Sequence, residues 1–248
     1  MRIFRRRLGM GGLATAAAGF GAALTLLAPS SGATTFDTTP SWDGSAFISS
    51  WGPGGTQTYG ETFIAPSDST LQSFTFYLRS DSGTTTFQAD VYAWSGNLKG
   101  GNSPQGATGP ALFTSPNMSL TANGSFQTVT VNTGGVSLTP GHAYVALLTT
   151  SDPASILANT GSFQSWEWGD TQLTHVANDG GGGFNFYNNA TSSELNTTSW
   201  DDFSDFGDLA WKAVFGPSVA VPEPTALSII LVGLAGLGFA RRRKSVQA

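Results

Sequence analysis

The sequence predicts an all-β protein: a single antiparallel β-sandwich, jelly-roll-like, between an N-terminal signal peptide and one short C-terminal transmembrane helix. Three observations lead to this prediction. Short segments alternate between apolar and polar residues, with turn residues between them. No segment of the middle region sustains the periodicity of an amphipathic helix. An apolar run with an adjoining basic cluster lies at each end of the chain.

The alternating segments place one apolar and one polar face on each expected strand, as in two antiparallel sheets packed face to face. They are 73–78, 87–94, 127–131, 143–147 and 209–215, with the first strand of the domain expected near 46–48. Turn dipeptides separate them, among them Asn123-Gly124, Pro140-Gly141 and Asp152-Pro153. The run Gly180–Gly183 is expected to be a flexible loop. We therefore expect one sandwich domain over residues 34–217.

Residues 1–33 have the pattern of a secretory signal peptide. Arginines precede an apolar stretch from Leu8 to Ala28, and the small residues Ser31 and Ala33 match the end of a cleavage site. A retained membrane helix is the alternative, but glycine and proline interrupt the apolar run and a cleavage site follows it. We expect the mature chain to begin near residue 34.

Residues 218–248 form a second segment that we set apart from the domain. A linker leads to Val-Pro-Glu-Pro at 221–224, an uncharged stretch at 225–240 and the basic cluster 241–244. As a helix, the uncharged stretch would be about 24 Å long, somewhat short of the roughly 30 Å hydrocarbon core of a bilayer. Long arginine side chains can reach the interface and make up the difference. The positive-inside rule keeps the basic cluster in the cytoplasm and the domain outside.

Charge and cysteine content exclude several classes of protein. Residues 34–221 contain three basic and fifteen acidic side chains, a net charge of −12. This sign is the opposite of what a nucleic-acid-binding protein needs, so we expect no nucleic-acid partner. The chain has no cysteine, which excludes disulfides, thiolate metal sites and a cysteine nucleophile. The domain must therefore be held together by burial of apolar surface.

The C-terminal segment resembles a PEP-CTERM sorting signal in three parts that occur in this order: Pro222-Glu223-Pro224, the uncharged stretch 225–240, and Arg241-Arg242-Arg243. The resemblance covers roughly the last 28 residues. It implies a bacterial envelope protein that an exosortase, a membrane-embedded processing enzyme, recognises at the Pro-Glu-Pro motif. It also implies a setting of exopolysaccharide and biofilm. An ordinary C-terminal anchor with a proline-rich collar is the alternative.

Two pairs of aromatic side chains are candidates for polysaccharide binding. Trp166 and Trp168 share one face of an expected strand, and Tyr92 and Trp94 share the face opposite Phe87. Rings two residues apart on a strand lie about 7 Å apart, a spacing suited to stacking on sugars. The alternative is that these rings fill the core, which is the more common place for tryptophan. Exposure decides between the two.

Catalytic motifs are absent from the sequence. There is no Gly-x-Ser-x-Gly elbow and no His-Glu-x-x-His motif, and we expect structural roles for His142 and His175. Glycoside hydrolysis needs two carboxylates across a cleft, and Glu61 and Glu167 are the candidates. The strand pattern directs Glu167 away from its flanking tryptophans. We therefore predict a non-enzymatic protein without a cofactor.

A group of aspartates before the last strand is a candidate calcium site: Asp201, Asp202, Asp205 and Asp208. Its spacing does not match an EF-hand loop, and a solvated acidic loop is the simpler interpretation. Asn178 and Asp179, next to the glycine run, make a similar, weaker pattern. The overall prediction is an exported surface or matrix protein that binds polysaccharide without catalysis. A hydrolase acting on envelope polysaccharide and a purely structural subunit remain as alternatives.

Overall fold

The computed structural model describes residues 32–100, 104–161, 164–172, 174–197, 199–200 and 206–216. All of them belong to one compact unit. Nearly all of the expected signal peptide, and the whole of the sorting segment 218–248 with its helix 225–240, lie outside the described residues. Within the described ranges, no helix is both long and apolar enough to cross a membrane.

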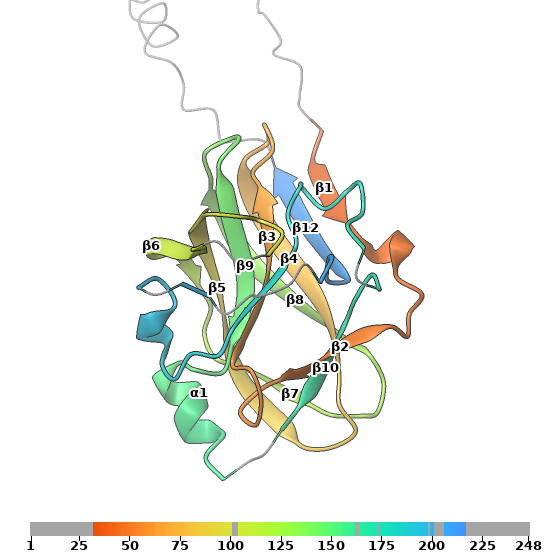
Figure 1. Ribbon diagram of the computed structural model, residues 1–248, viewed down its shortest axis with the longest axis vertical. Helices are drawn as coiled ribbons and strands as arrows, with labels where there is room; N and C mark the ends of the chain where they lie inside the picture. Colours follow the sequence, from red (N-terminus) through yellow and green to blue (C-terminus); the bar gives the residue numbers. More distant parts are fainter. Residues whose placement is uncertain are drawn as a thin grey trace, which may run out of the picture. The chain divides into compact units, whose positions relative to one another are not determined.

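Two six-stranded antiparallel sheets make up the domain (Figure 1). The first sheet contains β1 (Thr34–Asp37), β2 (Phe47–Trp51), β4 (Thr70–Arg79), β8 (Gln127–Ser137), β10 (Trp166–Gly169) and β12 (Trp211–Gly216). The second contains β3 (Thr58–Ile64), β5 (Thr84–Ser95), β6 (Gly106–Thr114), β7 (Met118–Thr121), β9 (Ala143–Thr149) and β11 (Phe184–Tyr187). The predicted all-β architecture with antiparallel sheets is confirmed.

β4 organises the first sheet, because three strands pair with it. β8 lies along one side, while β12 and then β10 share the other side. In the second sheet β5 and β9 pair over six residues, and β3 adds to the far side of β9. Successive strands such as β3, β4 and β5 alternate between the sheets, so the connections cross from one sheet to the other.

The alternation of apolar and polar residues places the expected side chains between the sheets. On β4, Phe74, Phe76 and Leu78 are fully buried, and on β5 Phe87 and Val91 face them in the same cluster. Because side chains alternate between the faces of a strand, one register places these three β4 side chains in the core, and the register with β8 shifts only nearer the start of β4, between Leu71 and Ser73. The strand predictions in these regions are confirmed.

The centre of the core is a layer of aromatic rings. Trp51, Trp166, Trp168 and Trp211 have no solvent exposure. The ring of Trp168 lies 4.8 Å from that of Phe76, 5.3 Å from Trp51 and 5.4 Å from Tyr59, measured between centroids. The contacts are edge-to-face or tilted, which is the arrangement that ring quadrupoles favour. Each such ring buries a large apolar surface, and this burial holds together a domain that has no disulfide.

The outer face of the second sheet is covered as well. Tyr92 and Trp94 belong to a second buried cluster with Leu195 and Trp200, which come from the segment around η2 (Ser192–Glu194). The rings of Trp94 and Trp200 meet edge to face at 5.1 Å. This outer face was expected to be polar and exposed to solvent. Part of it is instead a second, smaller apolar core, because the segment around η2 folds over it.

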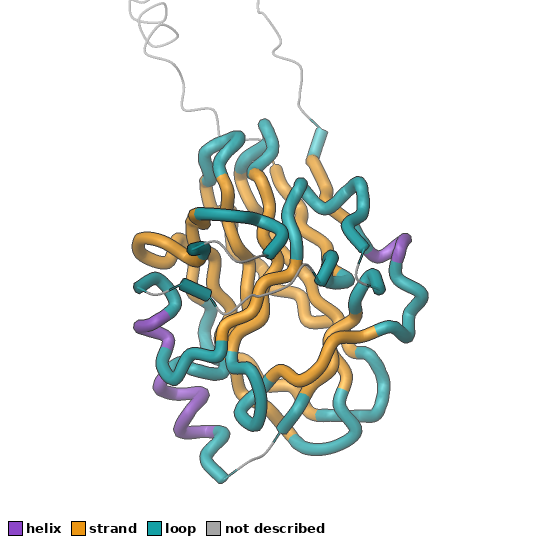
Figure 2. The backbone as a smooth tube through the Cα atoms, in the orientation of Figure 1, coloured by secondary structure: helices purple, strands orange, loops and turns teal. Residues whose placement is uncertain are grey.

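The helical segments are short (Figure 2). α1 (Pro153–Ala158) begins at Asp152, whose carboxylate accepts hydrogen bonds from the backbone of Ala154 and Ser155. Asp at the N-cap followed by Pro is a strong helix start. The interpretation of Asp152-Pro153 as a simple turn was therefore wrong. η1 (Thr39–Ser41) is a single turn.

The first strand also differs from the prediction. β1, at Thr34–Asp37, pairs with β12 and precedes the strand expected near residues 46–48, which is β2. Its burial alternates only weakly, so the sequence pattern there is faint. β1 completes the first sheet beside the last strand, bringing both ends of the described domain together.

Replacing Trp168 with alanine tests the importance of the aromatic layer. We expect Trp168→Ala to lower the free energy of unfolding by about 3–5 kcal/mol, because it leaves a cavity among three rings. Trp168→Phe keeps a ring and should cost less. Thr128→Ala, on the exposed face of β8, should change stability by no more than about 0.5 kcal/mol. Urea unfolding of the full chain measures the free energy of unfolding of all three variants. Equal losses of stability for Trp168→Ala and Thr128→Ala would contradict the central role of the aromatic layer.

Candidate functional site

The aromatic pairs predicted to stack on sugars are buried. Trp166 and Trp168 are 0% exposed, and Tyr92 and Trp94 are 8% and 6% exposed. The predicted parity is confirmed, since the tryptophans share one face and Glu167 lies on the other. The binding role was wrong for all four rings, because both faces on which they lie are covered by other parts of the chain.

Glu167 forms an ion pair on the outer face of the first sheet. Its carboxylate accepts a hydrogen bond of 2.7 Å from Nε of Arg79, which lies opposite it on β4. The Arg79 guanidinium also lies over the rings of Phe47 and Phe126. A polar hollow of about 410 Å³ lies beside Glu167. The Glu167 carboxylate is thus held in an ion pair with Arg79 on the outer face of the sheet.

Glu61 lies inside the sandwich. It shares the inner face of β3 with Tyr59 and Phe63 and has no solvent exposure. One carboxylate oxygen, Oε2, accepts a hydrogen bond of 3.0 Å from the backbone of Leu209. The other, Oε1, has no hydrogen-bond partner among the residues described. Burial raises the pKa of Glu61 well above its ordinary value, and the nearby Asp208 raises it further.

Asp208 and Asp179 lie close enough to Glu61 to act on its carboxyl group, and His175 contacts Asp208. Asp208 is fully buried and is hydrogen-bonded to Nδ1 of His175 at 2.7 Å and to the backbone of Val176 at 2.6 Å. Asp179 is 4% exposed and, with Asp208, acts electrostatically on Glu61. Burial raises the pKa of Asp208 to about 6, although the bonds to Val176 and His175 act in the opposite direction. We call Glu61, His175, Asp179 and Asp208 the acidic cluster.

The acidic cluster joins parts of two separate sequence patterns. Asp208 came from the predicted aspartate group, whose other members, Asp201, Asp202 and Asp205, lie outside the described residues. Asp179 came from the weaker pattern beside the glycines. Only the fold shows that Asp208 and Asp179 lie within reach of one ion. Glu61 was missed as a member, because an isolated glutamate on an alternating strand carries no sign of burial.

The glycine run holds Asp179 in place. The carbonyl of Gly180 accepts a hydrogen bond from Ile64, and that of Gly183 accepts one from Thr62. A side chain at Gly182 would overlap the Thr62 carbonyl, and one at Gly180 would meet the ring of Phe36. Only glycine allows so close a backbone approach to β3. The prediction of a flexible loop was wrong: this segment is fixed against the second sheet.

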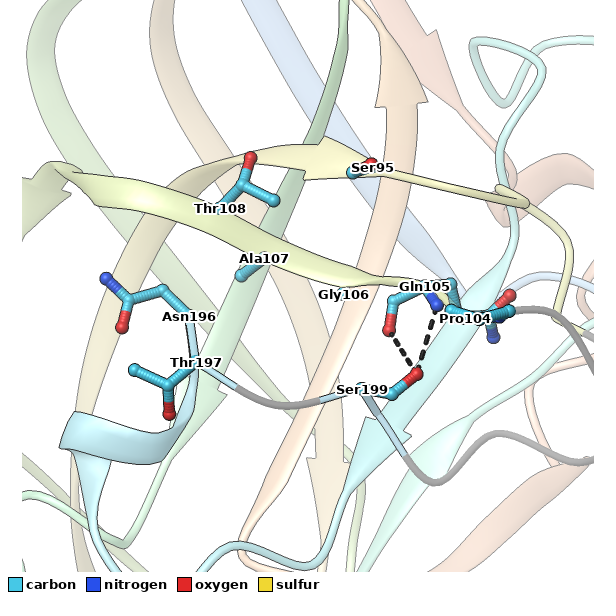
Figure 3. Close-up of a pocket in the computed structure, with 9 residues that line it drawn as sticks. All are labelled: Ser95, Pro104, Gln105, Gly106, Ala107, Thr108, Asn196, Thr197 and Ser199. Carbon is cyan, nitrogen blue, oxygen red and sulfur yellow. Dashed lines mark hydrogen bonds between the residues drawn. The ribbon is translucent and has the colours of Figure 1, made fainter.

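A surface groove of about 230 Å³ lies between β6 and the segment 196–199 (Figure 3). The described residues that line it carry no charged side chain: Ser95, Pro104, Gln105, Gly106, Ala107, Thr108, Asn196, Thr197 and Ser199. The Ser199 hydroxyl is hydrogen-bonded to both backbone groups of Gln105, at 3.1 and 3.2 Å, and ties the two sides together. Amides and hydroxyls around a small apolar floor suit an uncharged polar ligand.

Asp90 is a buried carboxylate away from the acidic cluster. It is 2% exposed, and its Oδ1 has no hydrogen-bond partner among the described residues. Burial raises the pKa of Asp90 to about 6, opposed by a hydrogen bond from Thr114 and assisted by the charge of Asp152. Because the folded chain then holds a proton that the unfolded chain releases, stability falls as the pH rises from about 4 to about 6.

Replacing Asp90 with asparagine should remove this contribution to the pH dependence. In buffer without divalent ions, we expect Asp90→Asn to gain about 2 kcal/mol of stability relative to the unsubstituted chain between pH 4.5 and pH 7.5. Urea unfolding at the two pH values measures the difference. If the free energy of unfolding of the two chains changed equally with pH, the pKa of Asp90 would not be raised by folding, and the prediction would be wrong.

Comparisons with known proteins agree with the sequence pattern of the C-terminal segment. A family model described as the PEP-CTERM protein-sorting motif matches residues 220–244, a range that includes Pro222, Glu223, Pro224 and the arginines at 241–243. No curated protein matches the chain.

Two solved structures are similar to the domain. One is the clostridial cysteine protease Cwp84 after propeptide cleavage, 18% identical with a TM-score of 0.40, covering 71% of this chain and 38% of that one. The other comprises the cysteine protease and lectin-like domains of Cwp84, a surface layer associated protein of Clostridium difficile. It is 17% identical with a TM-score of 0.37, covering 66% of this chain and 32% of that one. The chain thus spans less than two fifths of either structure. The match at residues 220–244 shows that the chain carries a PEP-CTERM protein-sorting motif.

Proposed function

We propose that this chain is an exported cell-surface or extracellular-matrix protein whose β-sandwich binds neutral polysaccharide without cleaving it. The observation that carries the proposal is the sorting motif at residues 220–244, placed directly after a domain that ends near residue 216. A PEP-CTERM motif implies export to the envelope and processing by an exosortase. The uncharged stretch 225–240 anchors the chain in the membrane until that processing occurs.

The surface groove supports a neutral glycan as the ligand. Hydroxyl and amide groups line it, and none of its lining residues in the described part of the chain is charged. Sugars are recognised through such groups, with small apolar surfaces beneath them. The net charge of −12 over residues 34–221 acts against an anionic polymer, because like charges repel at long range. These two features together favour an uncharged polysaccharide.

The positions of the glutamates support a role without catalysis. Glycoside hydrolysis uses two carboxylates that flank a substrate across a cleft. Glu167 lines the polar hollow together with Asp81, but its carboxylate is held in an ion pair with Arg79. Glu61 lies in the interior among Tyr59 and Phe63. The surface groove contains neither of them. Among the described residues of the lining, a bound polysaccharide would meet hydrogen-bonding groups and no carboxylate.

Filling the groove should abolish binding. Thr108 is exposed and lines the groove, so we expect Thr108→Arg to reduce retention on neutral matrix polysaccharide at least tenfold. Thr128→Arg makes the same charge change on exposed β8 of the other sheet and is the matched control. Affinity electrophoresis of the full chain measures retention. No retention of the unsubstituted chain would end the proposal, and release of reducing sugar would support the hydrolase instead.

Processing at both ends is tested by the intact mass of the chain from envelope and medium fractions of its native cells. We expect loss of about the first 33 residues and of everything after the Pro-Glu-Pro region, because the signal peptide and the sorting segment are both removed. Glu223→Ala should leave the first loss unchanged and prevent the second. An intact C-terminus in the unsubstituted chain would mean that residues 225–240 are a permanent anchor.

A further inference from the structure

The acidic cluster brings enough ligand atoms together to surround one cation. One ligand atom from each of His175, Asp179 and Asp208 lies within 4.8 Å of the others. Calcium–oxygen bonds are roughly 2.3–2.6 Å long, so an ion between two such atoms reaches both. Glu61 approaches from β3, and its carboxylate interacts electrostatically with Asp208 and Asp179.

Two oxygens of the cluster provide an independent indication of a ligand. Oε1 of Glu61 and Oδ2 of Asp179 have no hydrogen-bond partner within the described part of the chain, and the two side chains are 0% and 4% exposed. The second oxygen of each is held, by the backbone of Leu209 at 3.0 Å and of Gly181 at 2.7 Å. Buried polar atoms rarely lack a partner, since removing them from water costs free energy that only a new hydrogen bond or a bound ion offsets. Each carboxylate thus has one anchored oxygen and one available for an ion.

The donor set indicates which ion fits. The mutually close ligand atoms include oxygens from two carboxylates, those of Asp179 and Asp208, and the Glu61 carboxylate nearby adds a third. The chain contains no cysteine. Nδ1 of His175 is already hydrogen-bonded to Asp208 at 2.7 Å. Oxygen-rich sites suit calcium, whereas structural zinc sites are built from thiolates and imidazoles. An exported protein also meets calcium at concentrations that fill sites of modest affinity.

We infer that Glu61, Asp179 and Asp208 bind one calcium ion between β3 and the segment that leads into β12. The ion links the two sheets, because β3 belongs to the second and β12 to the first. Through Asp179, the ion also connects the glycine-run segment to both sheets. It thus has the stabilising role that a disulfide has in other exported domains. The inference does not depend on polysaccharide binding at the surface groove.

Calcium binding to the full chain, purified in detergent and stripped with EDTA, tests the inference. Equilibrium dialysis should find one calcium per chain. Thermal unfolding should show a midpoint raised by roughly 5–10 °C when calcium is at about a hundred times its dissociation constant. Magnesium at the same concentration should give a much smaller shift, because it dehydrates reluctantly. No bound calcium in the unsubstituted chain would overturn the inference.

Two substitutions separate calcium binding from folding. Asp179→Asn and Glu61→Gln keep the shape of the side chain and remove its charge, so we expect loss of bound calcium and of the calcium-dependent shift. In EDTA both variants should unfold at or above the temperature of the unsubstituted chain, because repulsion within the cluster falls. Asp90→Asn also removes a buried charge and should keep the full calcium response. Calcium retained by both cluster variants would place the ion elsewhere and overturn the assignment.

A zinc titration distinguishes the ion. His175→Ala should still bind one calcium, because the carboxylates supply the ligands. Zinc that binds more tightly than calcium, and that is lost in His175→Ala, would show a transition-metal site and overturn the calcium assignment.

Discussion

The packing of aromatic rings around Trp168 is the interaction on which the rest of the structure depends. Trp168 belongs to the first sheet, and its ring contacts Phe76 of that sheet and Tyr59 of the second. An exported domain without cysteine has no covalent cross-link to hold two sheets together. The apolar surface buried by these rings supplies the stability instead, and it also fixes the register of β4 and β10, since a shift of one residue would expose them.

A buried carboxylate inside this apolar layer is the exception to the pattern. Glu61 occupies a position on β3 between two aromatic side chains that pack in the core. The backbone N–H of Leu209 satisfies one of its carboxylate oxygens. The glycine run and the segment before β12 both lie against β3 near Glu61. Two loops that are distant in the sequence therefore meet at this one polar position in the core. Departures of this kind tend to mark functional sites.

The sorting motif and the two candidate sites lie on different parts of the chain. The sorting motif at residues 220–244 follows the last strand and directs the chain to the envelope. The surface groove and the acidic cluster belong to the folded domain, the first open to ligands and the second enclosed. The activity of the domain then rests on its own sites.

The sequence by itself determined the fold class, most strands and the sorting motif, because alternation, turn residues and terminal charge patterns are local signals. It also predicted which tryptophans share a face. Whether that face was covered depended on the segment around Trp200 folding over Tyr92 and Trp94, a contact between residues about a hundred positions apart. Likewise, Asp179 and Asp208 looked like two unrelated acidic loops. Only the tertiary structure placed them beside Glu61, since proximity in space between distant segments follows from strand pairing and leaves no mark in local composition.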